Sequence, residues 1–229
     1  MEIKTKAGIK AALAAKAKRS GVKIASATHN RRKTATEKTV KEAEVPVQTD
    51  TVAMSDKKKI LFVASECTPF IQTGGLAEVV GSLSKALAAS GKFDVRVVIP
   101  MYSDIKWEYK QKFNYIGNIY VPLAWRNQYC GIFTYEKDGV TFYFLDNEFY
   151  FKRPGCYGYF DDGERFAFFS RSVLEIMPFI NFYPDIMHCH DWQAALAAIY
   201  LKTNYCFRQE YQFIKALFTI HNIEYQGIY

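Results

Sequence analysis

The chain has 229 residues, of which 49% are hydrophobic, and it carries 30 Lys and Arg against 23 Asp and Glu. This apolar content excludes a wholly disordered chain, and because no apolar run reaches about 18 residues we expect no membrane-spanning helix. Five cysteines without CxxC spacing argue against a disulfide framework and against a zinc ribbon, and they favour a reducing compartment.

The positive charge is concentrated in residues 1–56. This segment holds 12 Lys and Arg against 6 Asp and Glu, and every Phe, Tyr and Trp comes after it. It cannot bury enough apolar surface to offset the entropy lost on ordering, so we predict a basic, disordered leader followed by a globular domain over residues 57–229. Because that domain is nearly neutral, its charge does not indicate a nucleic-acid partner.

The leader also bears on the compartment. A transit peptide is basic and rich in Ser, but it is poor in acids. Residues 1–56 contain several acids and more Lys than Arg, and both features fit that pattern poorly. We therefore expect a cytoplasmic protein, with a plastid as the alternative if the leader is a transit peptide.

The first part of the domain predicts a βαβ unit. Ile60–Ser65 is a short apolar run typical of a buried parallel strand. Leu76–Ser90 has apolar residues at helical spacing and is followed by Gly91, and Asp94–Pro100 is the next predicted strand. A strand, a helix and a second strand form the unit from which doubly wound sheets are built.

The middle of the domain predicts an antiparallel excursion from that sheet. Three strands are expected, at Phe113–Leu123, Gln128–Glu136 and Val140–Leu145, and a Lys-Asp-Gly turn joins the last two. Residues 149–162 are rich in Gly, Tyr and Asp and predict an ordered aromatic loop.

The last third returns to alternating helices and strands. A helix is predicted over 164–179, a strand at Asp185–Cys189, a helix at Trp192–Thr203 and a strand at Ile214–Ile220. The whole pattern predicts an α/β fold with a Rossmann-like, doubly wound and mostly parallel sheet.

Gly74 and Gly75 lie between the first predicted strand and helix. Two glycines let the backbone approach a ligand, and a helix N-terminus offers free N–H groups and a partial positive charge, so phosphate is a natural guest. The pattern is neither GxGxxG nor a P-loop, and a tight structural turn remains an equal alternative.

A second motif, with His188, His190 and Asp191, stands where a predicted strand ends and a helix begins. Ligands of open α/β sheets bind at such ends, which favours hydrogen bonding of a sugar or phosphate by His190. Alternation puts both histidines on one face of the strand, so a metal pair is the less favoured alternative. Asp191 alternatively serves as a helix N-cap.

Two further segments could contact carbohydrate. His221 and Asn222 follow the last predicted strand, where polar side chains suit sugar hydroxyls, although an ordinary polar loop is the alternative. Residues 147–155 combine aromatic and basic side chains, which suits sugar stacking better than nucleic-acid stacking in a nearly neutral domain.

Taken together, these segments resemble the N-terminal half of bacterial glycogen synthases and plant starch synthases. The resemblance extends from about Lys58 to Tyr229 with the motifs in the family's order. The residues that carry it are Ala64–Glu66, Thr73–Val80, Arg153–Gly155, Glu164–Phe169, His188–Ala194 and Thr219–Asn222.

The resemblance implies two Rossmann-like domains with the active site between them, the GT-B architecture. It also implies transfer of glucose from ADP-glucose to the 4-hydroxyl at the non-reducing end of an α-1,4-glucan, with retention of configuration. No metal and no cofactor are implied, because positive groups and helix N-termini neutralise the leaving diphosphate. The expected partners are the nucleotide sugar and the glucan, with no nucleic acid and no membrane.

The donor-binding residues implied by the resemblance lie around the glycine pair. Gly74 and Gly75 would donate backbone N–H bonds to the donor's phosphates, and Glu66 and Tyr150 would lie at the donor or acceptor side of the cleft. Gln72 stands where the family usually has Lys, two residues before the glycines. A carboxamide can donate a hydrogen bond but carries no charge, so Gln72 cannot neutralise a diphosphate. This argues for weaker binding of ADP-glucose or for a different donor.

The catalytic residue implied is His190, which would hydrogen-bond the transferred glucose, while His221 and Asn222 would line the same cleft. The family continues beyond the position of Tyr229 into a second domain, so we expect this fragment alone to be inactive. The alternatives are a UDP-glucose-using relative, a non-catalytic glucan-binding remnant and, third, a metal-dependent hydrolase built on His188 and His190.

Overall fold

The computed structural model describes residues 57–228, so the predicted leader lies outside the described residues. The elements follow in the order β1 (Lys58–Val63), α2 (Gly75–Ala89), β2 (Phe93–Pro100), α3 (Trp107–Lys110), β3 (Asn114–Leu123), β4 (Arg126–Lys137), β5 (Val140–Asp146), α4 (Glu148–Phe151), α5 (Asp162–Phe179), β6 (Ile186–His190), α6 (Asp191–Thr203), η1 (Gln209–Tyr211) and β7 (Lys215–Thr219). All the predicted strands and longer helices are present, whereas the short helices α3, α4 and η1 were not predicted.

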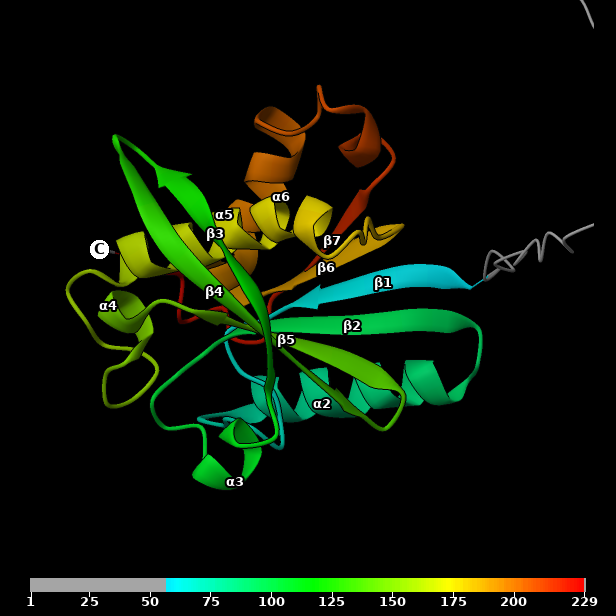
Figure 1. The fold of residues 1–229 in the computed structure, drawn as a ribbon, viewed down its shortest axis with the longest axis horizontal. Helices are drawn as coiled ribbons and strands as arrows, with labels where there is room; N and C mark the ends of the chain where they lie inside the picture. The colour runs from blue at the N-terminus through cyan, green and yellow to red at the C-terminus, as the bar shows by residue number, and fades with distance from the viewer. Residues whose placement is uncertain (1–56, 229) are drawn as a thin grey trace, which may run out of the picture. The chain divides into compact units, whose positions relative to one another are not determined.

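The strands form one mixed sheet in the order β3-β4-β5-β2-β1-β6-β7. The pairs β5-β2, β2-β1, β1-β6 and β6-β7 are parallel, whereas β4 runs antiparallel to both β3 and β5. The predicted antiparallel excursion is therefore confirmed. In Figure 1, α2 lies on one side of the sheet and α5 and α6 lie on the other, which is the doubly wound arrangement.

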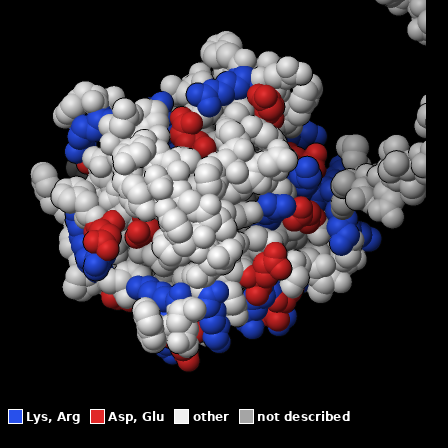
Figure 2. Space-filling model, viewed as in Figure 1, with Lys and Arg blue, Asp and Glu red and all other residues white. Residues whose placement is uncertain are grey.

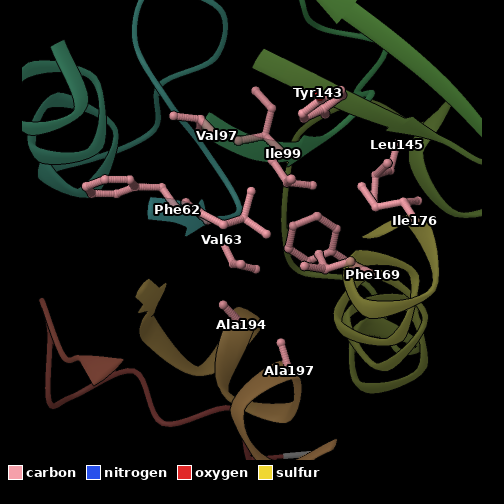
Figure 3. Packing of buried hydrophobic residues seen from close by; sticks show 14 of the residues in the cluster. Phe62, Val63, Val97, Ile99, Tyr143, Leu145, Phe169, Ile176, Ala194 and Ala197 are labelled. Carbon is pink, nitrogen blue, oxygen red and sulfur yellow. The ribbon is translucent and has the colours of Figure 1, made fainter. Parts of the chain in front are cut away.

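The centre of the sheet is buried on both faces. Phe62 and Val63, neighbours on β1, are both inaccessible to solvent and project from the strand in different directions (Figure 3). Ala194 and Ala197 of α6 are also buried, and their small side chains let this helix pack closely below β1. Burial on both faces explains why β1 is a continuous apolar run and not an alternating one.

The part of the chain that the structure describes has no helix with both the length and the hydropathy of a membrane span. The face drawn in Figure 2 mixes Lys and Arg with Asp and Glu, and its centre is free of charged side chains. On this face there is thus no continuous basic area of the kind that phosphate backbones attract. All five cysteines lie in the described residues and are unpaired.

Candidate functional site

A cavity of about 1090 Å³ lies past the carboxyl ends of β1, β6 and β7. Its lining comes from four stretches of the chain, within residues 66–79, 157–162, 191–193 and 221–228. Parallel strands that lie side by side end at the same edge of the sheet, so segments far apart in sequence meet here. This is the edge at which open α/β sheets bind their ligands.

The glycine pair forms the cavity wall at the start of α2. Gly74 is the N-cap residue and no side chain caps the helix, so its first N–H groups have no side-chain acceptor. Gly74 has an extended backbone (φ −152°) that any residue adopts, and a Cβ added to Gly74 or Gly75 would meet no atom within 4 Å. Neither turn geometry nor internal packing therefore explains the glycines, which favours a ligand over a structural turn.

Glu66 fixes the loop that leads to Gly74 and Gly75. Its carboxylate, which is 4% exposed, accepts hydrogen bonds from the backbone N–H and the hydroxyl of Thr73, the latter at 2.9 Å. Tyr157 adds a third bond from its hydroxyl at 3.1 Å, and Ser65 lies 2.7 Å from the same hydroxyl. Burial, followed by the charge of Glu66, raises the pKa of Tyr157 well above its ordinary value, so the phenol stays protonated.

His190 is wholly buried and does not itself line the cavity. His221 does line it, and His221 Nε2 lies 2.8 Å from His190 Nδ1. Burial, with smaller effects from His188 and His221, lowers the pKa of His190 to about 3, so this imidazole is neutral at physiological pH. The Nε2 atom of His190 is buried and has no hydrogen-bond partner among residues 57–228. Such an orphaned polar atom costs free energy until a partner arrives.

His188 lies on the same face of β6 as His190, as the alternation predicts, with the ring centroids 4.1 Å apart. Its Nε2 lies 2.7 Å from the Thr219 hydroxyl, and burial lowers its pKa. Within the described residues no group of three or more His, Cys, Asp and Glu side chains could hold a metal ion. The two histidines thus have no third ligand in this part of the chain.

Asp191 does not cap α6, so that alternative is wrong: His190 occupies the N-cap position. Asp191 has a left-handed backbone (φ +56°), which is unusual for a residue other than Gly. Its carboxylate accepts the backbone N–H of His221, two residues after the end of β7, at 2.6 Å. The bond joins the ends of β6 and β7 and fixes the start of segment 221–228 against the cavity.

Two of the predicted donor-binding residues lie elsewhere. Gln72 does not line the cavity, and its amide donates to Glu78 at 2.9 Å on the exposed side of α2. Tyr150 is buried, and its hydroxyl donates to Glu164 at 2.5 Å. The contacts made by Gln72 and Tyr150 are therefore internal, and their roles toward the donor stay predictions.

The remaining predicted residues are brought together. Glu66, Gly74, Gly75, His221 and Asn222 all line the same cavity, although up to 156 positions separate them in the sequence. No Lys or Arg is among the lining residues of the described chain, whereas four acids are: Glu66, Asp162, Asp191 and Glu224. An anionic ligand would therefore rely on backbone N–H groups at this wall and on cations from beyond it.

Sequence reasoning missed part of the lining. Tyr157, Phe160 and Trp192 all face the cavity, and Phe160 is fully exposed. The aromatic loop was predicted, but not which of its rings would face the ligand. Asp162, whose carboxylate accepts the N–H groups of Gly158 and Tyr159 at 2.7 and 3.2 Å, fixes the loop. An acid three or four residues after a Gly-Tyr pair is the signal that could have indicated this turn.

The chain is similar to known proteins in sequence and in fold. A family described as the starch synthase catalytic domain matches residues 59–229. The chain is 53% identical over 171 residues to a glycogen synthase of Desulforamulus reducens and 49% identical over 171 residues to one of Lactobacillus acidophilus. These matches cover 75% of this chain but only 35% and 36% of the relatives.

A solved structure agrees with these matches. The catalytic domain of starch synthase IV from Arabidopsis thaliana, bound to ADP and acarbose, superposes with a TM-score of 0.68 at 29% identity. The superposition covers 75% of this chain and 35% of that chain. The chain thus spans about a third of the length of the relatives that it matches.

Proposed function

Because the chain belongs to the starch synthase catalytic domain family, we propose that it forms part of a glycosyltransferase that adds glucose from ADP-glucose to an α-1,4-glucan. The membership confirms the resemblance deduced from the motifs, and the Rossmann-like sheet agrees with the starch synthase fold. The reaction would place glucose on the 4-hydroxyl at the non-reducing end, with retention of configuration. The ADP in the starch synthase IV structure supports ADP-glucose over UDP-glucose as donor.

The observation that carries the proposal is the convergence of two unlike turns on one cavity. The turn at Gly74 and Gly75 offers backbone N–H groups with no internal acceptor or packing reason. The turn after β6 offers a neutral, buried His190 with an orphaned nitrogen, joined to the cavity by His221. A nucleotide sugar needs these two kinds of group, because its diphosphate is anionic and its glucose carries neutral hydroxyls.

Each side of the cavity would have its own part in the transfer. As the bond between C1 of glucose and the diphosphate oxygen breaks, negative charge grows on the diphosphate, and the N–H groups at Gly74 and Gly75 stabilise it. A new bond joins C1 to the acceptor's 4-oxygen, whose proton passes to the leaving diphosphate oxygen. His190 holds the transferred glucose by a hydrogen bond, so that C1 stays aligned with both oxygens.

Among residues 57–228, no Lys or Arg lines the cavity. Two backbone N–H groups neutralise a diphosphate only in part, so further positive groups would come from outside residues 57–228. No metal or cofactor is proposed, because such groups and the helix N-terminus would suffice. The proposed compartment is the cytoplasm, with the plastid as the alternative, and the leader that decides between them lies outside the described residues.

The test is glucose transfer by the product of the complete reading frame. Labelled glucose from ADP-glucose should enter glycogen and become releasable by an enzyme specific for α-1,4 bonds. A clear preference for UDP-glucose would correct the donor. Binding of glycogen with no transfer from either donor would replace the proposal by a non-catalytic glucan-binding role.

A further inference from the structure

Three of the chain's four histidines meet at the carboxyl ends of β6 and β7: His188 and His190 belong to β6, and His221 follows β7. The rings of His190 and His221 are stacked, with centroids 5.1 Å apart and planes inclined by 21°. Their nitrogens Nδ1 and Nε2 are 2.8 Å apart, which is hydrogen-bond distance. The other member, His188, directs its Nε2 to Thr219 and not to either of these nitrogens.

A hydrogen bond between two imidazole rings needs one N–H donor and one bare nitrogen acceptor. His190 is neutral, so only one of its nitrogens carries a proton. If His221 donates, Nδ1 of His190 is bare and the orphaned Nε2 is an N–H donor. If His190 donates, its Nε2 is instead an acceptor. The direction of this one bond therefore decides what His190 can offer a ligand.

The surroundings of His221 favour the first arrangement. His221 is only half-buried and lines the cavity, so water can satisfy its Nδ1 as an acceptor. A neutral imidazole in contact with water carries its proton mainly on Nε2, the atom that faces His190. The bond from the His221 backbone N–H to Asp191 fixes the backbone at this residue, and the stacking of its ring on His190 keeps the two rings in register.

We propose that His221 is a positioning residue, whose Nε2–H bond to Nδ1 of His190 fixes His190 as the tautomer with its proton on Nε2. His190 then presents an N–H donor to an oxygen of the glucosyl group, a role that rests on the proposed function. Because Nε2 is shielded from solvent in this structure, neighbouring side chains shift before a sugar oxygen reaches it. The tautomer itself is preset before any substrate binds.

The tautomer can be measured without activity. Nitrogen-15 NMR of histidine-labelled protein separates protonated from bare ring nitrogens, and only four histidines need assignment. Near pH 7, we expect Nε2 of His190 to be protonated and its Nδ1 to be bare. A protonated Nδ1 in the wild-type protein would overturn the inference, whether or not the protein transfers glucose.

Three variants test whether His221 sets the tautomer of His190. His221→Phe keeps a ring of similar size but removes the donor, so the Nε2–H preference of His190 should be lost. His221→Gln supplies an amide donor and should restore it. Thr219→Val removes the hydroxyl partner of His188 and leaves the His190–His221 pair, so it is the matched control. An unchanged tautomer in His221→Phe would overturn the role of His221.

Kinetics of the complete gene product link the tautomer to the reaction. His221→Phe should lower kcat by about tenfold to a hundredfold with little change in KM for ADP-glucose, and His221→Gln should recover most of the loss. A rise in KM alone would overturn the positioning role. If no variant and no wild-type protein transfers glucose while the tautomer is as expected, the proposed function fails but the inference about His221 and His190 stands.

Discussion

Two strand-to-helix turns lie at the same edge of the sheet and are built in opposite ways. The turn into α2 has no side chain at Gly74 or Gly75 and no cap, so its backbone is open to the cavity. The turn into α6 is filled by His190 and Asp191, which are buried and bonded to His221. The fold thus offers backbone at one turn and a preset side chain at the other.

Because the two turns differ, they can bind different parts of one ligand. A backbone wall at a helix N-terminus attracts an anion with little regard for what is attached to it. A buried imidazole in one tautomer accepts only a ligand atom of the right kind at one place. We infer that the first turn supplies affinity for the diphosphate and that the second aligns the sugar.

The largest effect is expected from His190→Ala in the complete gene product. Loss of a hydrogen bond that strengthens in the transition state should cost about 2–4 kcal/mol, or roughly two to three decades in turnover. Steady-state kinetics with ADP-glucose would measure it, and a thermal melt would check the fold. His188→Gln is the control on the same strand face, with a smaller loss expected. Turnover near the wild-type value in His190→Ala would make His190 a structural residue only.

A pH effect should come from the same buried side chain. The folded-state pKa of His190 is lowered from 6.5 to about 3, so below pH 6.5 the unfolded chain binds a proton that the folded chain does not. The free energy of unfolding therefore falls as pH falls, by about 2 kcal/mol between pH 6.5 and pH 5 from this group. Urea unfolding of wild type and His190→Gln would measure it. An equal fall in both would assign the acid sensitivity to other groups.

The open turn should respond to added bulk. Gly74→Val places a branched side chain where the cavity now has space, so the affinity for ADP should fall by about tenfold, or about 1.4 kcal/mol. Calorimetric titration of the complete gene product would measure it. Ala89→Val, at the exposed far end of α2, adds bulk to the same helix and should leave ADP binding unchanged. Equal ADP affinities in wild type, Gly74→Val and Ala89→Val would show that the phosphates do not bind at this turn.

The smallest effect is expected at Gln72, the position where the resemblance leads us to expect Lys. An ammonium near the open turn should tighten ADP binding by up to about 1 kcal/mol, near fivefold, and the gain should shrink as salt rises. Glu78 accepts from Gln72 at 2.9 Å and would hold that ammonium away from the phosphates. Gln72→Lys alone should therefore gain less than Gln72→Lys combined with Glu78→Gln. Equal gains, or none, would show that position 72 does not act on the phosphates.

The strands and long helices could be predicted because their signals are local. A continuous apolar run such as Ile60–Val63 or the helical spacing from Leu76 onward needs no knowledge of the rest of the chain. The helix α3 has only four residues and no buried residue, and it was not predicted. The N-cap prediction for Asp191 was wrong because its carboxylate accepts from the backbone of His221, just after β7, which local capping rules do not consider.

The candidate site could be predicted only in part. Because ligands of open α/β sheets bind at the carboxyl ends of strands, the positions of the motifs predicted that Gly74, His190 and His221 lie at one edge of the sheet. The pairing of His190 with His221 spans 31 positions and that of Glu66 with Tyr157 spans 91, so both depend on how the strands are ordered in the sheet. The internal bonds of Gln72 and Tyr150 likewise involve side-chain orientations that residue spacing does not encode.

If the two turns divide the work as inferred, they bind different parts of one donor. The most direct measurement is a crystal structure of the complete gene product with a non-transferable analogue of ADP-glucose. We predict diphosphate oxygens about 3 Å from the backbone nitrogens at Gly74 and Gly75, and a glucosyl oxygen at the same distance from Nε2 of His190. A diphosphate bound away from the glycines, or a glucosyl group with no contact to His190, would contradict the account.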